Sequence, residues 1–279
     1  MDRLSSLLQT FTPTARQIGM LEYGPEGMLL PEGSNILFLN QGDLSIDADP
    51  DLQIKCGDLL WITHDEFRTL SSTSEDLQLL CCNMDFGPSQ LNPVFDKLPP
   101  VVQIHADDQA RETLNPTLQL LLLESMQQRC GQETVLNRLA EVLLVHMLRF
   151  LMKNQLLEYG VIAGLSDIRL ARAITAMHNQ PEQRWSVETL ANEAGMSRTA
   201  FNQHFRDTVG CPPGEYLTRW RMRLACQLLE NNHLSIGQIV DQLGYLSDTA
   251  FFRAFRKAVG VSPGQYRQKA IANQGIALQ

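Results

Sequence analysis

Two similar segments in the last third of the chain carry polar side chains at matching positions. They read AFNQHFRDTVGCPPGEY from Ala200 and AFFRAFRKAVGVSPGQY from Ala250, with nine identical residues at identical spacing. In a helix, the paired phenylalanines at i and i+4 share one face and leave the opposite face free. Amide side chains can pair bidentately with adenine, and guanidinium groups with guanine. The repeated segments therefore present groups suited to reading the base edges of DNA.

The free face of each segment supplies the candidate contacts. In the first segment this face comprises Arg198, Thr199, Asn202, Gln203 and Arg206. In the second segment it comprises Asp248, Thr249, Phe252, Arg253 and Arg256.

Each segment follows a short amphipathic stretch and a glycine turn, AGMS or GYLS. This order predicts two helix-turn-helix units, in which the second helix enters the major groove of DNA. A longer helix from Gly214 to about Glu230 joins them, roughly 22 Å for about 15 residues. The two reading helices can then lie about 34 Å apart, one turn of B-DNA. The alternative is a pair of helical hairpins that bind protein, and the duplicated polar face favours DNA.

The charge is divided unevenly along the chain. Residues 1–166 contain 10 Lys and Arg against 22 Asp and Glu, whereas residues 167–279 contain 13 against 9. The net charges are therefore −12 and +4, and the basic half is the half with the repeat. An excess of four positive charges also fits an ordinary solvated surface, so it adds little to the DNA hypothesis.

The first half of the chain predicts a β-structure followed by helices. Between residues 20 and 86, short apolar runs alternate with turn residues, which is typical of a small barrel or sandwich. Residues 117–129 and 133–158 are predicted to be helices, and the second is apolar around most of its circumference. Such a helix must be covered on more than one side, by the barrel or by a second subunit. The segment EYGVIAGLS is predicted to be a linker between two domains.

Several classes of protein are disfavoured. No run of about 18 apolar residues is present, and the N-terminus lacks the apolar core of a signal peptide. We therefore expect a cytoplasmic protein with no membrane association. The six cysteines show no metal-ligand spacing and are expected to be free thiols.

The C-terminal part, residues 167–268, resembles the AraC/XylS family of transcription regulators. The resemblance rests on RWSVETLANEAGMSRTAFNQHFRDTVGCPPGEYLTRWRMRLACQLL and on LSIGQIVDQLGYLSDTAFFRAFRKAVGVSPGQYR. It implies a non-enzymatic regulator, with activation favoured, whose partners are double-stranded DNA and RNA polymerase. The family's base-contacting residues fall on Thr199, Asn202, Gln203, Thr249, Ala250 and Arg253.

The N-terminal part, residues 1–160, resembles the cupin-type sensor domains of this family through CGDLLWITHDEFRTL and LQLLCCNMDF. The complete fold expected is α+β: a cupin-like β-barrel with a helical pair, then an all-α domain with two helix-turn-helix subdomains. We expect the helices between residues 117 and 158 to form or support a homodimer, and the resemblance implies control by a small-molecule effector or a redox signal.

The cupin part lacks the metal-binding pattern of cupin enzymes. No His-x-His is present, His64 stands alone, and Arg68 occupies the place of the late histidine. A metal site needs three or four ligands, so we expect no metal and no cofactor. A metal-dependent cupin enzyme fused to a DNA-binding domain is the alternative.

Three residues of the cupin part are candidates for sensing. Arg68 could bind an acidic ligand or form a structural ion pair with a carboxylate such as Asp65. Cys81 and Cys82 could react with oxidants or could be small buried hydrophobic residues, which is the more common role.

Overall fold

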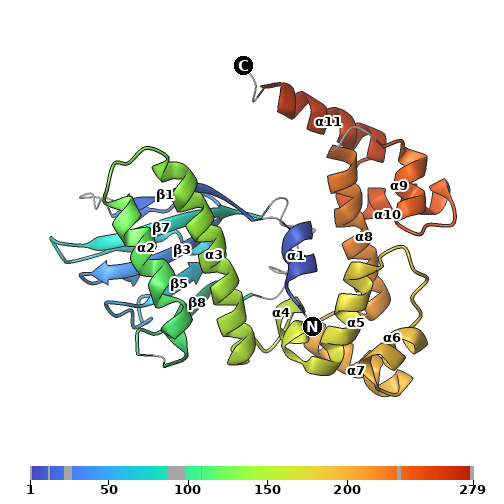
Figure 1. The fold of residues 1–279 in the computed structure, drawn as a ribbon, viewed down its shortest axis with the longest axis horizontal. Helices are drawn as coiled ribbons and strands as arrows, with labels where there is room; N and C mark the ends of the chain where they lie inside the picture. The colour runs from blue at the N-terminus through green and yellow to red at the C-terminus, as the bar shows by residue number, and fades with distance from the viewer. Residues whose placement is uncertain are drawn as a thin grey trace. The chain divides into compact units, whose positions relative to one another are not determined.

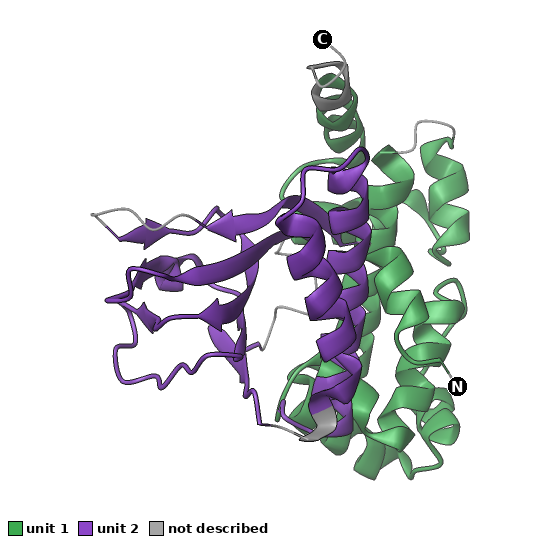
Figure 2. Ribbon diagram, turned by 60° about the vertical axis from the view of Figure 1, so that its left-hand side comes forward, with its two compact units in different colours: residues 1–11, 88–97, 158–279 green, residues 12–87, 98–157 purple. Residues whose placement is uncertain are grey.

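The computed structural model describes residues 2–11, 13–21, 27–86, 98–107, 109–230 and 234–276. The chain divides into two compact units, coloured differently in Figure 2. Unit 2 comprises residues 12–87 and 98–157, whereas unit 1 comprises residues 1–11, 88–97 and 158–279, and residues 88–97 lie outside the described residues. The expected N-terminal domain of residues 1–160 therefore differs from the compact unit at its start, because the first eleven residues pack with the C-terminal part.

Unit 2 contains eight strands in two antiparallel sheets among its described residues. The strands are β1 (Thr14–Leu21), β2 (Met28–Leu29), β3 (Ser34–Gln41), β4 (Ser45–Ile46), β5 (Leu59–Ile62), β6 (Thr69–Ser71), β7 (Gln78–Asp85) and β8 (Val101–Ile104). The five-stranded sheet has the order β1-β7-β3-β5-β8, and the three-stranded sheet has the order β2-β6-β4. The predicted cupin-like β-structure is confirmed, although its two sheets do not close into one continuous barrel.

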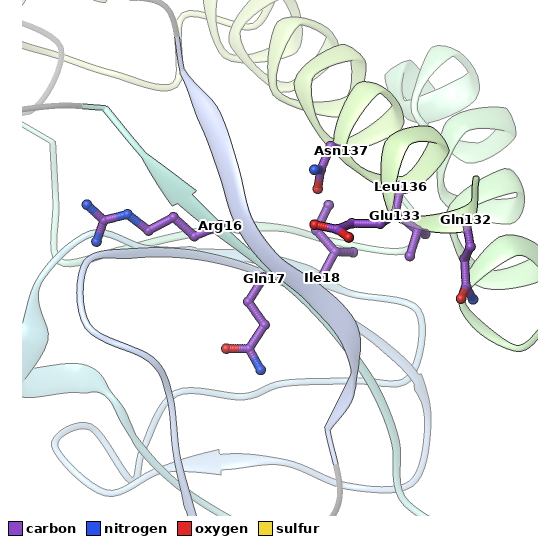
Figure 3. A pocket seen from close by; sticks show the side chains of 7 residues that line it. All are labelled: Arg16, Gln17, Ile18, Gln132, Glu133, Leu136 and Asn137. Atoms are coloured by element: carbon purple, nitrogen blue, oxygen red, sulfur yellow. The ribbon is translucent and has the colours of Figure 1, made fainter. Parts of the chain in front are cut away.

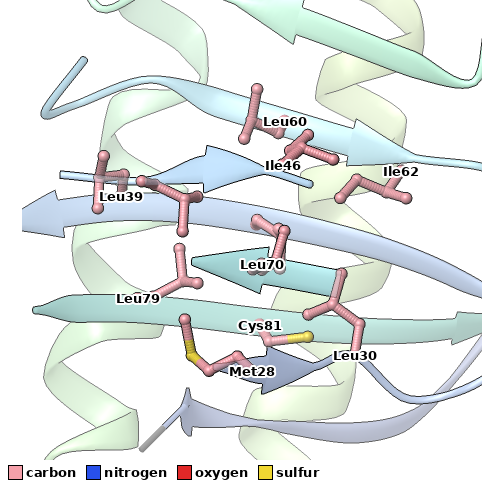
Figure 4. Close-up of a cluster of buried hydrophobic side chains, with 11 residues drawn as sticks. Met28, Leu30, Leu39, Ile46, Leu60, Ile62, Leu70, Leu79 and Cys81 are labelled. Carbon is pink, nitrogen blue, oxygen red and sulfur yellow. The ribbon is translucent and has the colours of Figure 1, made fainter. Parts of the chain in front are cut away.

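The space between the two sheets is filled with apolar side chains (Figure 4). Eleven buried residues form this cluster, among them Leu37, Leu60, Leu70 and Leu79. In β5, Leu59, Leu60, Trp61 and Ile62 are all fully buried, so this strand is covered on both faces. The interior of the cupin unit is therefore packed by its own side chains at these positions.

Two helices cover one face of the five-stranded sheet (Figure 1). They are α2 (Asn115–Ser125) and α3 (Gln132–Lys153), and the described residues of the unit also include two short 3-10 turns, η1 (Asp65–Phe67) and η3 (Gln109–Thr113). The predicted helical pair is confirmed, and the second helix ends five residues before the expected residue 158. Its buried side chains, such as Leu143, Leu144 and Met147, face the sheet and α2.

Helices are the only regular secondary structure among the described residues of unit 1. Its elements are α1 (Ser5–Thr10), α4 (Val161–Ser166), α5 (Ile168–Asn179), α6 (Val187–Ala194), α7 (Arg198–Val209), α8 (Pro213–Glu230), α9 (Ile236–Gln242), α10 (Asp248–Val259) and α11 (Pro263–Ile276). No helix in the described part of the chain is long and apolar enough to span a bilayer.

The first helix of the chain packs on α5 and α8. The ring of Phe11 meets the Trp220 ring edge-on at 5.5 Å between centroids, and the guanidinium of Arg223 lies 5.4 Å from the same Phe11 ring. Gln227 donates a hydrogen bond to the carbonyl of Thr10. Leu7 and Phe11 are almost completely buried, so α1 is part of the core of unit 1.

Part of the expected linker EYGVIAGLS has regular structure, because residues 161–166 form the buried helix α4. The packing around Gly164 explains why this position requires a glycine. A Cβ at position 164 would lie 2.8 Å from Ile174 Cδ1 and 2.9 Å from Val209 Cγ2. The glycine therefore permits close packing of α4 on α5 and α7, and does not mark a loop.

A buried histidine of α5, His178, contacts both α1 and α8. The ring of His178 stacks on Trp220 at 3.6 Å between centroids, and its Nε2 is 2.6 Å from the Tyr216 hydroxyl. Its Nδ1 is 3.3 Å from the Ser6 hydroxyl of α1. Burial lowers the pKa of His178 from 6.5 to about 3, so this ring is neutral near neutral pH.

This lowered pKa predicts acid sensitivity. Because the pKa of His178 is lower in the folded chain than in the unfolded chain, its contribution to stability is complete above about pH 6.5 and is lost as the pH falls. We expect the native chain to lose up to about 1.4 kcal/mol per pH unit relative to His178→Gln between pH 6 and 4. Urea unfolding followed by circular dichroism measures this difference. Parallel pH profiles of the two proteins would contradict the prediction.

Candidate nucleic-acid interface

The first helix-turn-helix unit is formed by α6 and α7. The Ser186 hydroxyl accepts from the amide of Thr189, and the Ser197 hydroxyl accepts from the amide of Ala200, so both helices have side-chain N-caps. Gly195 takes a left-handed conformation (φ 63°) between the helices. The rings of Phe201 and Phe205 are fully buried, which fixes the opposite face of α7 toward solvent.

The second unit, formed by α9 and α10, repeats this construction. Ser235 and Ser247 cap its helices, and Phe251 and Phe255 are fully buried. The turn contains Gly244, whose φ of 69° suits glycine. A Cβ at position 244 would also collide with the backbone carbonyl of Glu182, in the loop that precedes α6. Gly244 therefore allows the two units to approach each other.

The predicted DNA-contacting residues lie on the exposed faces of α7 and α10. Most of them are exposed, whereas Asn202 and Ala250 are half-buried. Phe252 is 37% exposed, and its ring makes an edge contact with the Phe251 ring. The exposed predicted contacts are Arg198, Thr199, Gln203 and Arg206 on α7, with Thr249, Arg253 and Arg256 on α10.

The two units are joined through α8, which is buried toward both. The Tyr216 ring contacts the Phe205 ring of the first helix-turn-helix edge-on. Met222, Cys226 and Leu229 belong to the apolar core of the second helix-turn-helix. Arg221 adds a polar connection across the same junction. Its Nε and Nη2 donate to the carbonyls of Pro181 (2.6 Å) and Gln183 (2.9 Å) in the loop before α6.

Arg221 also contacts the second helix-turn-helix. Its guanidinium carbon lies 5.6 Å from the centre of the Tyr245 ring, which follows Gly244 in the second turn. One side chain on α8 thus holds the loop of the first unit and the turn of the second. The separation of α7 and α10 is therefore set by packed and hydrogen-bonded contacts within unit 1.

A basic groove lies between α8 and α10. It has a volume of about 1,030 Å³, and its lining includes Arg219, Arg253 and Lys257 together with Glu215. Arg219 forms an ion pair with Glu215 at 2.7 Å. Because Arg253 belongs to the predicted reading face, the groove continues that face toward α8. Its cations are of the type that binds DNA phosphates.

A second hydrogen-bonded connection anchors α7. The carboxylate of Asp167 caps α5 by accepting from the amides of Arg169 and Leu170, and its Oδ2 lies 2.7 Å from His204 Nε2. Burial alone would raise the pKa of Asp167. The hydrogen bonds from His204 and from the two amides outweigh burial and lower the pKa below its ordinary value.

The sensing candidates of unit 2 occupy structural positions. Arg68 Nε donates to the carbonyl of Leu30 at 2.8 Å, and its Nη1 lies 3.5 Å from Asp65 Oδ1. Only 15% of the Arg68 side chain is exposed. These contacts match the structural ion pair that was the alternative to ligand binding.

Cys81 and Cys82 are adjacent on β7 and point to opposite faces of the sheet. Cys81 belongs to the core between the sheets, and both residues are buried. Burial raises the pKa of the Cys81 thiol to about 12, and burial together with Cys81 raises that of Cys82 further. The reactive form of a cysteine is its thiolate, so both thiols are poorly reactive in this state. All six cysteines lie in the described part of the chain, and none of them is in a disulfide bond.

The described residues offer no cluster of three or more metal-binding side chains. His64 is exposed, and its Nδ1 lies 2.8 Å from the Thr63 hydroxyl. A polar hollow of about 270 Å³ lies between β1 and the start of α3 (Figure 3). Gln132, Glu133 and Asn137 border it, and Arg16 on β1 is held by Asp85 at 2.6 Å.

Four functional candidates were not predicted: Asp207, Arg219, Arg221 and Lys257. Asp207 accepts hydrogen bonds from Gln203, and its signal in the sequence was the i, i+4 spacing of the two residues. Lys257 occupies the equivalent position in the second copy. The three arginines of TRWRMR were visible, but no local pattern separates groove-lining Arg219 from bridging Arg221.

Comparison with known proteins agrees with this geometry. A family model described as Cupin matches residues 2–153, and one described as Helix-turn-helix domain matches residues 190–269. A putative AraC-like transcription regulator of Streptomyces lividans is 31% identical over 220 residues, covering 78% of this chain and 72% of that protein.

Two further similarities concern smaller parts of the chain. The RCS-specific transcriptional activator RclR of Escherichia coli K12 is 36% identical over 91 residues, covering 33% of this chain and 32% of RclR. The crystal structure of the DNA-binding domain of AdpA with a target DNA is similar over 38% of this chain and 95% of that chain, at 34% identity and a TM-score of 0.36. The chain belongs to the family of AraC-like DNA-binding transcription regulators, with a cupin domain followed by a double helix-turn-helix domain.

Proposed function

We propose that this protein reads two successive major-groove segments of double-stranded DNA with α7 and α10. The observation that carries the proposal is the exposure of two similar polar helix faces within one unit, at a separation held by α8 and Arg221. Arg253 contacts guanine, and Asn202 and Gln203 contact the other half of the site. Arg198, Arg206 and Arg256, with the basic groove, supply contacts to phosphates.

The protein acts as a regulator and not as an enzyme. The rival function is a metal-dependent cupin enzyme, which requires a set of three or four metal ligands. Metal analysis of the purified chain separates the two functions. The third alternative, a protein-binding helical module, predicts no salt-dependent binding to DNA.

Activation of transcription through RNA polymerase is the effect we propose for DNA binding. The family supports a role in transcription, and the Escherichia coli relative is named an activator. A regulator of this kind acts where the chromosome is, so the proposed location is the cytoplasm.

The helical pair of unit 2 is proposed to form a homodimer. Its outer surface exposes Leu120 and Leu123 of α2 and Val135 and Val142 of α3, each between 42% and 58% exposed. Val135 and Val142 are two helical turns apart, and Leu139 lies half-buried between them. An apolar stripe of this spacing suits the same stripe of a second copy.

The signal received by unit 2 is proposed to be a small molecule. The alternative is thiol oxidation at Cys81 or Cys82, and it is disfavoured by their burial and raised pKa values. Arg68 remains the charged candidate for an acidic effector, although its contact with the Leu30 carbonyl also explains its position. An effector must bind the two functional states with different affinity to control DNA binding.

Substitution of Arg253 by Ala tests the DNA contact. We expect it to cost about 1–3 kcal/mol of binding free energy and to relax the preference at one base pair. Fluorescence anisotropy with duplexes recovered by selection measures both effects, and footprinting should protect two major-groove segments about 34 Å apart. Lys269→Ala, on exposed α11, is the control and should bind as the native chain does. Equal weakening on all sequences would make Arg253 a phosphate contact.

Charge on the apolar stripe should separate the subunits. We expect the Val135→Glu, Val142→Glu double variant to sediment as a folded monomer, because each carboxylate would be buried without a partner in the interface. Leu29→Glu changes an equally apolar residue, 70% exposed on β2, and should leave the dimer intact. The idea fails if the native chain is monomeric at high micromolar concentration in analytical ultracentrifugation.

Labelling with iodoacetamide tests the thiol alternative within one chain. Cys56 and Cys130 are exposed and should react in the native protein, whereas Cys81 and Cys82 should react only after unfolding. The Cys81→Ala and Cys82→Ala variants should respond to inducing conditions as the native protein does in a reporter assay. Loss of response in either variant, with the same thermal stability, would restore the redox hypothesis.

A further inference from the structure

A side-chain pair on the exposed face of α7 fixes the orientation of a predicted reading residue. Gln203 Nε2 donates to both carboxylate oxygens of Asp207, at 2.8 Å from Oδ1 and 2.9 Å from Oδ2. The two residues are one helical turn apart, and both are exposed. The carboxamide of Gln203 is therefore held from its nitrogen side.

The chemistry of the partner decides which end of the amide is turned away. A carboxylate only accepts hydrogen bonds, so the amide group that faces Asp207 must be the donor, Nε2. The carbonyl oxygen Oε1 is then the end of Gln203 that is turned away from Asp207. At a protein–DNA interface, a glutamine held in this way directs its acceptor atom, Oε1, toward the bases.

The four bases differ in what they offer to such an acceptor. In the major groove adenine and cytosine each expose an exocyclic amine, whereas guanine and thymine expose carbonyl oxygens. We infer that Asp207 is a positioning residue that restricts Gln203 to reading an amine, so that the first copy prefers adenine or cytosine over guanine or thymine at one position of its site. This inference rests on the proposed binding of α7 to DNA.

The second copy carries the opposite chemistry at the same two positions. Arg253 stands in the place of Gln203, and Lys257 stands in the place of Asp207. Both are donors, and both line the basic groove with Arg219. An arginine without a neighbouring carboxylate one turn away suits the acceptors N7 and O6 of guanine. The two similar helices therefore read different groups on the bases: α7 reads an amine, and α10 reads the acceptors of guanine.

The expected size of the preference is moderate. A hydrogen bond between exposed groups contributes little more than a neutral hydrogen bond in a folded protein, which corresponds to about 3- to 10-fold in affinity. A guanine or thymine at this position requires Gln203 to leave Asp207 and turn its amide, and the lost hydrogen bond is the cost of that turn.

Selection from a duplex library with a randomised 24-base-pair core tests the inference on the full chain. The native chain should enrich adenine and cytosine over guanine and thymine at one position by about 3- to 10-fold. Gln203→Ala should abolish this preference. Asp207→Ala and Asp207→Asn should reduce the preference to about 2-fold or less. Alanine makes no side-chain hydrogen bond to Gln203, and asparagine can bind either the nitrogen or the oxygen of its amide.

Two matched variants separate positioning from folding and from charge. Asp207→Glu keeps a carboxylate and should retain the preference, which a general loss of structure would not do. Lys257→Ala changes the equivalent residue of the second copy. It should weaken binding to all sequences and lower the slope of log K against log salt by about one, with the amine preference unchanged.

The outcomes distinguish this inference from the function on which it rests. If the native chain enriches a defined site and Asp207→Ala retains the full preference, the role of Asp207 is wrong and DNA reading stands. If Gln203→Ala changes no position, Gln203 is not a reading residue and the inference also fails. If the native chain enriches no sequence at all, the proposed function fails and the inference fails with it.

Discussion

The helix α8 is the constraint on which the arrangement of the DNA-binding unit depends. It contributes Tyr216 to the packing of the first helix-turn-helix and Met222, Cys226 and Leu229 to the core of the second. Arg221 adds contacts to the loop before α6 and to Tyr245. Two reading helices are useful on one face of a duplex only at a fixed separation. A helix buried on both sides, with one side chain bridging its neighbours, supplies that separation without a second subunit.

The same unit is also built from the beginning of the chain. The helix α1 buries Leu7 and Phe11, places Ser6 beside His178 and positions the Thr10 carbonyl for Gln227. Strand β1 of the cupin unit begins at Thr14, three residues after Phe11. The DNA-binding unit therefore includes the segment that precedes the cupin unit in the chain, residues 2–11, as well as the segment that follows it from residue 158.

Duplication has preserved the frame of the two units and changed their surface chemistry. The buried phenylalanines, the serine caps and the left-handed glycines recur, because they determine the fold of each unit. The exposed positions diverge, and Asp207 faces Gln203 where Lys257 accompanies Arg253. Selection for a single DNA site with two different halves would favour this combination, since fold and recognition depend on different faces of the same helices.

The sequence by itself determined the two helix-turn-helix units, the candidate residues on their exposed faces, and a cupin-like β-structure followed by a helical pair. These features follow from local patterns: i, i+4 phenylalanines, glycines at turns, and short apolar runs separated by turn residues. Only the tertiary structure decided that α1 belongs with the C-terminal unit, that residues 161–166 are a buried helix, and that Cys81 and Cys82 are both buried. Gln227 and Thr10 are separated by 217 residues, and Gly244 requires its glycine because of Glu182. Such contacts join distant segments, and the energy of burying them depends on partners that no local pattern specifies.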